Sequence, residues 1–462
     1  MTHRLDELAA QVWTLAGGAP DVPARLTATG PRTFLPSAFD VTGLATASVA
    51  AAALAAAEYR AARNQSPVAA VRVDSRAACA AFAAEGLFTP VGWSLPDIWD
   101  PVAGNYQARD GWIRLHTNYA SHRAAVTGLL EADDRDSVQA AVSQWKKADL
   151  EAAVVAAGGC AAAMHGRDNW LASPPGTASA AAPALTVTQR PLPAGSGTGA
   201  ARAERPAGQP YAGLRVLDLT RVIAGPIATR HLAAHGADVL RIDPPGFAEV
   251  PALLPETTAG KRTAALSLTT PAGRTTFEQL VTEADVLVTG LRADALGRLG
   301  YGDATLTALN PALIIASHNA YGWDGPWRDR RGFDSLVQMS CGIAATGDSG
   351  RPAPLPVQAL DHATGYLLAA AVGHALTARL THDVASRILA SLIGTANLLW
   401  TLPRPADLGD IPTMPRREEF QLVDTRTAWG RARRVPVPGE IAGAAPELRI
   451  EAGPLGRHQP AW

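Results

Sequence analysis

Short apolar runs alternate with longer helical stretches through the C-terminal part of the chain. The helical stretches include residues 225–237, which begin "GPIATRHL", and residues 271–284, which begin "PAGRTTFEQL". The apolar runs between them are "LRVLDLT", "DVLRID", "RTAALSL", "DVLVTG" and "ALIIASHNAYG". This alternation predicts a parallel sheet covered by helices on both faces, and hence an α/β fold class. Ligands of such sheets bind at the carboxyl ends of the strands.

A stretch dense in Pro, Gly, Ser and Ala divides the chain. Residues 172–210 contain few large apolar side chains, so they bury too little surface to hold a fixed fold alone. We therefore predict a linker over 176–210. The chain has 462 residues, which is enough for two or three domains in all, and the linker would divide them into an N-terminal and a C-terminal part.

Composition narrows the function classes. The formal net charge is -1, so the chain lacks the basic excess of a general nucleic-acid binder. Cys79, Cys160 and Cys341 are odd in number and far apart, which indicates free thiols and no metal site. The N-terminus lacks a signal-peptide core, and alanine-rich runs such as "ATASVAAAALAAAEY" are too short and weakly hydrophobic to cross a bilayer. We expect a soluble, cytoplasmic protein with no nucleic-acid or membrane partner.

Two segments repeat one pattern. "LPSAFDVTGLATASVAAAALAAA" begins at Leu35, and "LPVQALDHATGYLLAAAVGHALTA" begins at Leu355. Each has Leu-Pro, an acid, Thr-Gly and a long helix of small residues, which indicates a partial duplication. The acids differ in register: Asp361 lies three residues before its threonine, whereas Asp40 lies two residues before. Phe39 therefore occupies the place of Asp361, and we interpret Asp40 as a helix cap.

The turn after the first predicted strand of this sheet lacks the usual nucleotide-binding signature. It reads "TRVIAGPIATR", with one glycine and a proline, where a dinucleotide cradle needs G-x-G-x-x-G. P-loop, H-E-x-x-H and G-x-S-x-G motifs are also missing from the sequence. NAD, FAD, zinc-protease and α/β-hydrolase chemistry therefore have no support.

Five segments in order resemble the class III CoA-transferase family, which includes formyl-CoA and carnitine CoA-transferases and α-methylacyl-CoA racemases. They span residues 212 to 378 and comprise "GLRVLDLTRVIAGPIATRHLAAHGADVLRID", "GKRTAALSLTTPAGR", "ADVLVTGLRADALGRLGYG", "LNPALIIASHNAYGWDGPWRDRRGFDSLVQMSCGIAATG" and "LPVQALDHATGYLLAAAVGHAL". The resemblance implies a Rossmann-like large domain that binds the nucleotide end of CoA and a second, smaller α+β domain.

The N-terminal part resembles a later portion of the same family. "GNYQARDGWIRLH" and the helical segment after it are similar to the family's small domain, so the domain order is rearranged. The resemblance implies an N-terminal helical segment (1–94), a small domain (95–175), the linker, a large domain with the catalytic aspartate (211–400) and a closing segment (401–462). It also implies a homodimer, although this order would allow a site within one chain.

The resemblance gives Asp361 in "DHATG" the role of nucleophile. A carboxylate with an ordinary pKa near 4 is ionised at neutral pH, so it needs no general base to attack a thioester. An acyl-CoA and a carboxylic acid acceptor would be the substrates, with no permanently bound cofactor. Backbone N–H groups near glycines such as Gly342 or Gly365 would stabilise the oxyanions. From the residues alone, without the resemblance, a helix cap at the start of a long helix is the favoured interpretation of Asp361.

Two other functions stay open at this point. A racemase of the family needs a second acid or base, and Phe333 in "RRGFDS" stands where its histidine would be. His318, His362 and His374 do not match that motif, so transfer is favoured over racemisation. A degenerate member that binds CoA without turnover is the third interpretation.

CoA carries phosphates, so its site needs local cations. Carried over from the family, the candidates are Val222 on the turn after the first strand of the sheet, Lys261 and Arg262 in "GKR", Arg298 in "GRLGYG" and Arg331 in "DRRGFD". Gly290 stands where the family often has asparagine, and Ile223 where some formyl-CoA transferases have glutamine. No glycine-rich substrate loop is evident, so oxalate or formate is not supported.

Overall fold

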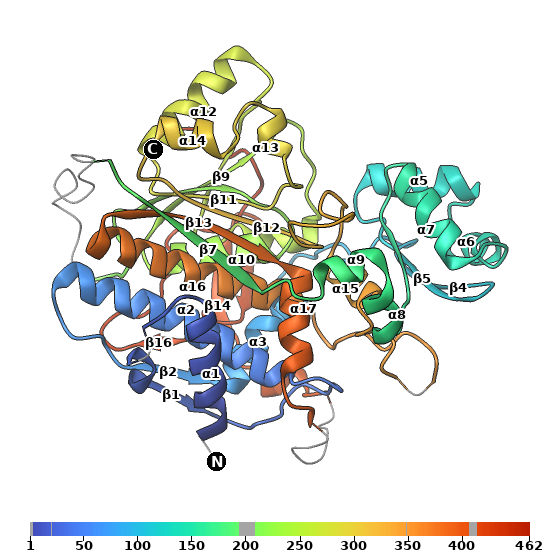
Figure 1. The fold of residues 1–462 in the computed structure, drawn as a ribbon, viewed down its shortest axis with the longest axis horizontal. Coiled ribbons are helices and arrows are strands. Elements are labelled where there is room, and N and C mark those ends of the chain that lie inside the picture. The colour runs from blue at the N-terminus through green and yellow to red at the C-terminus, as the bar shows by residue number, and fades with distance from the viewer. Residues whose placement is uncertain (1–2, 20, 194–207, 348, 406–413) are drawn as a thin grey trace.

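A seven-stranded sheet forms the centre of the computed structural model, which describes residues 3–19, 21–193, 208–347, 349–405 and 414–462 (Figure 1). The strand order is β10-β9-β8-β11-β12-β13-β7, and all pairs except β13 with β7 are parallel. Counted from β8, this is the 3-2-1-4-5-6 order of a Rossmann sheet, which confirms the predicted fold class. The parallel strands are β8 (Arg215–Leu219), β9 (Asp238–Asp243), β10 (Arg262–Ala265), β11 (Val286–Thr289), β12 (Ile314–Asn319) and β13 (Val384–Ser391).

Helices cover both faces of this sheet because its strands are apolar on both sides. Alternate side chains of β8 enter different cores: Val216 packs with α10 (Ala224–Ala234) and α16 (Ala359–His382), and Leu217 packs with α12 (Pro271–Glu283) and α14 (Asp303–Leu309). Figure 1 shows α12 and α14 on one side of the strands and α10 and α16 on the other. The carboxyl ends of the strands remain uncovered for a ligand.

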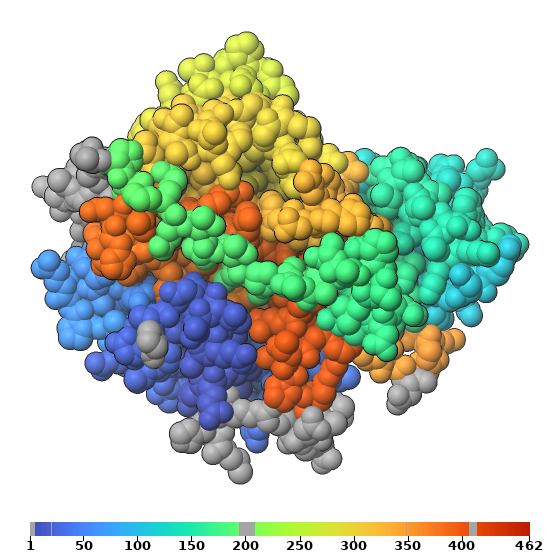
Figure 2. Space-filling view, in the orientation of Figure 1, coloured from blue at the N-terminus to red at the C-terminus, as the bar shows by residue number. Residues whose placement is uncertain are grey.

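The predicted linker is structured over part of its length. Residues 185–191 form β7 (Leu185–Pro191), which pairs antiparallel with β13 at the edge of the large sheet. The segment "LTVTQRP" alternates β-branched with polar residues, and this strand pattern was hidden within the Pro/Ala-rich composition. In Figure 2 the green atoms of this segment cross the molecule between yellow and orange regions. Residues 194–207 of the predicted linker lie outside the described residues.

Within the predicted small domain (95–175), a sheet and helices pack together as a lobe, teal at the side of Figure 2, which we call the small domain. Its antiparallel sheet consists of β4 (Gly104–Ala108), β5 (Gly111–Leu115) and β6 (Ala161–Ala163), covered by α5 (Ala120–Leu130), α6 (Arg135–Val142) and α7 (Lys147–Ala156). Val102, Ile113 and Leu150 belong to a core of its own. α8 (Arg167–Ala172) and α9 (Pro174–Ser179) lead from it towards β7.

The N-terminal and C-terminal segments form sheets with each other. β1 (Leu26–Thr29) and β2 (Val71–Asp74) pair with β16 (Glu440–Ile441), and β3 (Thr89–Pro90) pairs with β15 (Gly430–Arg434) beside β14 (Val423–Thr427). The remaining elements are α1 (His3–Leu15), η1 (Val22–Arg25), α2 (Val41–Asn64), α3 (Ser75–Phe82), α4 (Ala84–Leu87), η2 (Pro251–Leu253), α11 (Leu254–Thr257), α13 (Ala295–Arg298), α15 (Asp334–Ser340), α17 (Leu392–Thr401) and η4 (Arg417–Glu419).

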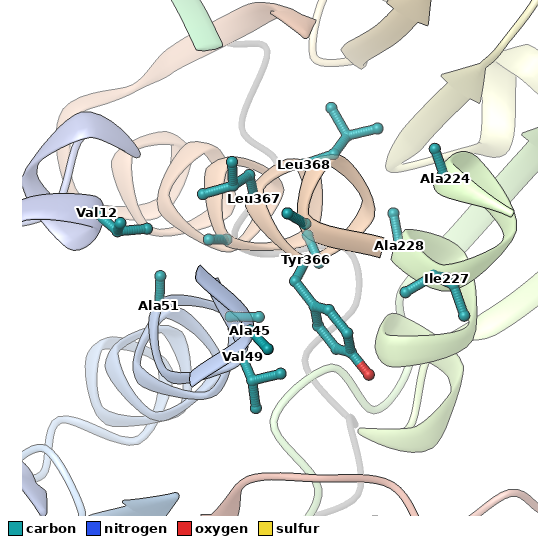
Figure 3. Close-up of a cluster of buried hydrophobic side chains, with 14 of the residues drawn as sticks. Val12, Ala45, Val49, Ala51, Ala224, Ile227, Ala228, Tyr366, Leu367 and Leu368 are labelled. Carbon is teal, nitrogen blue, oxygen red and sulfur yellow. The ribbon is translucent and has the colours of Figure 1, made fainter. Parts of the chain in front are cut away.

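The alanine-rich helix α2 is the central buried helix of the N-terminal half. It spans 24 residues, so its length and mean hydropathy of 1.5 would allow it to cross a membrane, contrary to the sequence-based expectation. However, 94% of its apolar window is buried inside the protein, which identifies it as a core helix. Figure 3 shows α2 beside α16, where Ala45 and Val49 face Tyr366. A Cβ on Gly373 of α16 would lie 2.7 Å from the Cβ of Ala55, so small residues are required for this close approach.

Candidate active site

The strand ends border a cleft with two chambers that meet at Asp361. One chamber, of about 330 Å³, is lined mainly by apolar side chains such as Ile98, Leu253 and Phe420, and we call it the apolar chamber. The other, of about 410 Å³, is lined by four arginines, and we call it the basic chamber. Asp361, Tyr119, Val222 and Phe333 line both. Tyr119 comes from the small domain, so one chain supplies both walls of the cleft.

Asp361 lies in the first turn of α16 but does not cap it. The N-cap residue is Gln358, and the capping oxygen comes from Asp334 of α15, whose Oδ2 accepts from the backbone N–H groups of Leu360 (2.8 Å) and Asp361 (3.0 Å). Among the described residues, no hydrogen bond reaches the carboxylate of Asp361. The helix-cap interpretation of Asp361 is therefore wrong, and its carboxylate faces the cleft without a partner.

Burial and neighbouring acids change the acidity of Asp361. Burial, then Asp334 and Glu85, raise the pKa of Asp361 well above the usual aspartate value. Burial also raises the pKa of Asp334 to about 6. The backbone N–H groups that donate hydrogen bonds to Asp334 lower its pKa, but by less than burial raises it. The sequence-based expectation of an ordinary, fully ionised carboxylate must be corrected accordingly. Since the N-terminus of a helix favours negative charge, α16 partly offsets the effect of burial.

Glu85 is a site residue that the sequence analysis missed. It lies on α4 of the N-terminal half and lines the apolar chamber together with Asp361. Its Oε2 is 3.1 Å from Nε2 of His362, and its buried Oε1 has no hydrogen-bond partner. His362 is itself buried and stacks on Phe82. No local motif surrounds Glu85, and 277 residues separate it from His362, so no sequence signal indicated this pair.

Val222 has a strained backbone at the junction of the chambers. Its φ of 65° is in the left-handed region, which is costly for a β-branched residue. The Val222 N–H donates to Oε2 of Glu249 (3.1 Å), which also accepts from Arg241. Oε1 of the same carboxylate accepts from the hydroxyl of Tyr119 at 2.6 Å. Glu249 thus connects the turn after β8 to the small domain.

Cations gather in the basic chamber and at its rim. Arg221, Arg292, Arg330 and Arg331 line it. Arg331 is exposed and donates to the carbonyl of Gly158 (3.2 Å), whereas Arg330 is held at 2.7 Å by Glu151. Burial, then Arg331 and Arg298, lower the pKa of Arg292. Arg298 is exposed on α13. Of the predicted CoA residues, Val222 and Arg331 therefore line the cleft and Arg298 lies near its rim.

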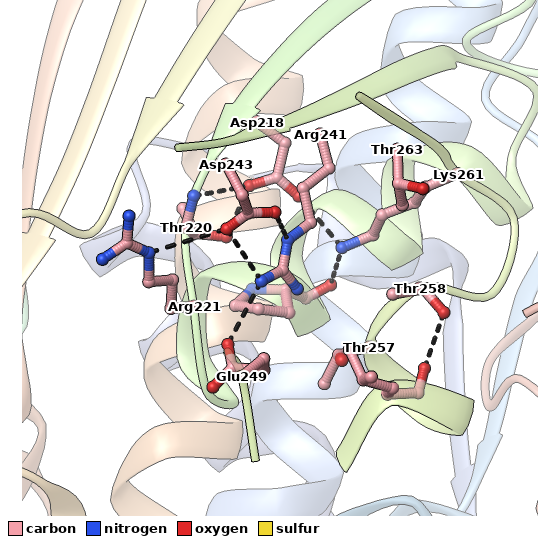
Figure 4. A network of polar contacts seen from close by, with 12 residues as sticks. Asp218, Thr220, Arg221, Arg241, Asp243, Glu249, Thr257, Thr258, Lys261 and Thr263 are labelled. Atoms are coloured by element: carbon pink, nitrogen blue, oxygen red, sulfur yellow. Dashed lines mark hydrogen bonds and ion pairs between the residues drawn. The ribbon is translucent and has the colours of Figure 1, made fainter. Parts of the chain in front are cut away.

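Lys261 and Arg262 lie elsewhere. Lys261 is fully buried, and its Nζ contacts Oδ2 of Asp218 (3.0 Å) and the carbonyl of Pro226 (2.9 Å), as Figure 4 shows. Burial lowers the pKa of Lys261 to about 8. Arg262 is paired with Asp238 at 2.7 Å and lies against Trp462. Both cations are thus engaged in the framework of the large domain, and neither lines the two chambers.

The cleft histidines are held neutral. Phe333 stacks on His116 with the ring centres 3.7 Å apart, and burial lowers the pKa of His116 to about 3. Burial likewise lowers the pKa of His318 to about 4. The ring of His318 occupies the space that a Cβ on Gly290 would need. His374 pairs with Glu58 away from the chambers. Phenylalanine at 333 leaves the cleft without the second acid or base of the racemase pattern.

The two glycines suggested as oxyanion donors serve helix packing. A Cβ on Gly365 would lie 2.5 Å from the carbonyl oxygen of Ala224, and one on Gly342 would lie 2.6 Å from the backbone nitrogen of Arg167.

The three cysteines are buried and free, and in the described part of the chain no cluster of His, Cys, Asp or Glu could hold a metal ion.

Comparison with known proteins gives one family. Residues 211–417 match the family model described as CoA-transferase family III. The chain is similar to a probable fatty acyl-CoA transferase, Rv3272, of Mycobacterium tuberculosis (33% identity, covering 41% of this chain and 52% of that protein). It is also similar to a succinate–glutarate CoA-transferase of Agrobacterium fabrum (35%, covering 36% and 47%) and a formyl-CoA:oxalate CoA-transferase of Rhodopseudomonas palustris (30%, covering 52% and 58%).

The chain spans about half the length of these curated relatives. A crystal structure of the Mycobacterium tuberculosis protein is 33% identical, with a TM-score of 0.40 over 44% of this chain and 58% of that one.

Proposed function

Residues 211–417 of this chain belong to CoA-transferase family III, and on that premise we propose that the protein moves CoA from an acyl-CoA to a carboxylic acid through Asp361. The observation that carries the proposal is the carboxylate of Asp361, which lies where the two chambers meet and accepts no hydrogen bond from the described residues. A thioester that spans the junction would have CoA in the basic chamber and its acyl group in the apolar chamber.

The chemistry follows from that placement. An oxygen of ionised Asp361 attacks the thioester carbonyl carbon; the C–S bond breaks, giving a mixed anhydride and the CoA thiolate. The thiolate attacks the aspartyl carbonyl, releasing the donor acid and leaving an aspartyl-CoA thioester. The acceptor carboxylate then attacks the carbonyl of the aspartyl-CoA thioester, which gives a second mixed anhydride and the CoA thiolate. The thiolate attacks the acceptor carbonyl of this anhydride, so the acceptor leaves as its CoA thioester and the Asp361 carboxylate is restored. No external base, metal or oxidant enters this balance.

Arginines of the basic chamber would hold the CoA phosphates. Arg331, Arg292 and Arg298 present positive charge to solvent there, and planar guanidinium groups bind phosphate well. The turn at Val222 would lie against the bound thioester, since this residue lines both chambers. No permanently bound cofactor is needed.

Trapping of the covalent intermediate tests the proposal. The protein is mixed with an acyl-CoA and hydroxylamine, and peptides are examined by mass spectrometry for a hydroxamate at residue 361. We expect modification of the wild type and none of Asp361→Asn. Continued turnover in Asp361→Asn would reject the proposal. A protein that binds acyl-CoA but forms no adduct would match the non-catalytic alternative.

The assembly and the location remain predictions. The resemblance implied a homodimer, but side chains of residues 95–175 already line the cleft with Asp361 of the same chain. The proposed catalytic unit is therefore one chain, and a homodimer would add no side chain that this mechanism uses. Light scattering in solution distinguishes one chain from two. Cytoplasmic location, and the lack of nucleic-acid or membrane partners, are likewise carried forward as predictions.

A further inference from the structure

We infer that the transferred acyl group is apolar and derives from a monocarboxylic acid, because the described lining of the apolar chamber offers no cation for a second carboxylate. This inference rests on the proposed function and names its substrate class. It concerns acyl groups whose far end remains inside the chamber.

Most of the chamber wall is hydrophobic, although Asn118 and Gln358 also line it. The apolar residues of the wall include Leu87, Ile98, Val250, Leu253, Val357 and Phe420. A cavity of about 330 Å³ has room for a short aliphatic chain or one aromatic ring. Burial of such a group against this wall provides a hydrophobic gain of about 0.8 kcal/mol per methylene.

Charge in the chamber is negative. No lysine or arginine occurs among the described residues that line it, and its two acids are Asp361 and Glu85. His116 is neutral there, because burial lowers its pKa to about 3. Two arginines lie close to the chamber without lining it: Arg417 donates to the carbonyls of Gly86 and Leu87, and Arg114 lies 4.7 Å from the ring centre of Trp99.

A second carboxylate would thus be buried without a cation and beside two acids. An unpaired ionised group loses several kcal/mol of hydration on burial, and like charges add to that loss. A methyl group at the same place has no such penalty. The two chambers therefore favour different groups: the basic chamber favours the binding of negatively charged groups, and the apolar chamber disfavours it.

The inference applies to acyl chains short enough to end inside the apolar chamber. Glu85, Gly86, Ile98 and Trp99 also line an adjoining open groove that contains Arg135. A long dicarboxylate could place its far end there, so probes of four and six carbons are the appropriate test.

Matched donors provide the experiment. Butanoyl-CoA is compared with succinyl-CoA, and hexanoyl-CoA with adipoyl-CoA; each pair has the same number of carbons and differs only in a terminal methyl or carboxylate. We expect kcat/KM to be about 100-fold or more higher for the methyl-ended donor of each pair, because burial of an unpaired charge costs several kcal/mol. Equal values, or a preference for the carboxylate, would overturn the inference.

A charge variant gives the converse test. Ile98 is half-buried on the chamber wall, so Ile98→Lys would supply the missing cation, and Ile98→Met is the control of similar size without charge. We expect Ile98→Lys to improve adipoyl-CoA relative to hexanoyl-CoA by about 10-fold or more, and Ile98→Met to leave the ratio unchanged. Thermal unfolding of both variants verifies that they fold.

Binding separates this inference from the proposed function. Hexyl-CoA and 5-carboxypentyl-CoA are thioethers that cannot react, and calorimetry measures their affinity for the wild type. Tighter binding of hexyl-CoA in a protein that turns over no donor would retain the selectivity and reject the transfer. Equal binding, tighter binding of the carboxylate, or no binding of either would reject the selectivity, whatever the turnover.

Discussion

The helices α2 and α16 show how similar backbones can have different chemical roles. Both span 24 residues, their N-cap residues have φ of -76° with ψ of 66° and 64°, and both end on a left-handed residue with φ of 51°. They pack side by side in the core (Figure 3). The helix geometry is repeated, but in a different register from the Leu-Pro…Thr-Gly pattern: Thr42 is the second residue of α2, whereas Thr364 is the sixth residue of α16.

The two helices differ in the source of the capping carboxylate. At α2, Oδ1 of Asp40 accepts from the N–H of Gly43 at 2.7 Å, so the helix uses its own acid. Phe39, which the Thr-Gly alignment of the two sequences places opposite Asp361, lies just before the N-cap of α2 and packs edge-on against Trp400, with the ring centres 4.9 Å apart. The third residue of α2, at the helix position of Asp361, is Gly43. At α16, Asp334 on another helix supplies the cap, and Asp361 stays unpartnered. A helix start can therefore present a reactive acid when its cap comes from elsewhere.

Asp361→Asn is the change for which we expect the largest effect. It retains the shape of the side chain and removes the nucleophile, so kcat for CoA transfer should fall by about 10⁴-fold or more. Asp40→Asn is the matched control at the other helix and should leave kcat within about two-fold, since that acid caps α2 and does not line either chamber. A steady-state assay of both variants makes the comparison. Similar losses in both would show that helix stability, and not the nucleophile, limits the reaction.

Phe39→Asp tests whether a carboxylate is tolerated just before α2, at the position that the Thr-Gly alignment places opposite Asp361. Phe39 is 2% exposed, so the variant removes a large buried ring and buries a charge, with the guanidinium of Arg404, 3.9 Å from the ring centre, beside it. We expect a loss of about 4 kcal/mol or more in the free energy of unfolding, measured in urea. Phe39→Leu, which changes only the packing, should lose about 1–2 kcal/mol. If Phe39→Asp were as stable as Phe39→Leu, the two environments would be more alike than the structure indicates.

Asp334→Asn weakens the separate cap of α16. The amide oxygen still accepts a hydrogen bond, but the charge that interacts with the N–H groups of Leu360 and Asp361 is lost. We expect a decrease of about 1–2 kcal/mol in the free energy of unfolding. The pKa of Asp361 should move towards acid, since a neighbouring negative charge has been removed. An alkaline movement of the pH profile would contradict this account.

Glu85→Gln should produce the smallest effect. The raised pKa of Asp361 means that kcat/KM rises with pH as its carboxylate ionises, because only the ionised form attacks. Glu85 contributes to that raised pKa, so its replacement should shift the rising limb to lower pH by less than about one unit. A kcat/KM profile against pH measures the shift. Glu58→Gln, remote from the chambers, is the control and should leave the limb in place.

Local patterns in the sequence determined the main architecture of this protein. Apolar runs between helical stretches predicted the parallel sheet, because burial on both faces of a strand imposes that composition along the chain. The family resemblance carried by "DHATG" selected Asp361 as the candidate nucleophile, and its side chain lies where the two chambers meet. The register of Asp40 and Phe39 correctly predicted a cap at α2.

Only the tertiary structure decided which charges face the cleft. Lys261 and Arg331 are both basic residues in plausible motifs, yet one is buried against Asp218 and the other lines the basic chamber. Glu85 reaches the surroundings of Asp361 from a distant part of the chain and carries no local signal, and the position of Asp334 as the cap of α16 was likewise not predicted. The physical reason is range: hydrophobic periodicity acts over one element, whereas the pairing of charges depends on how separate elements pack.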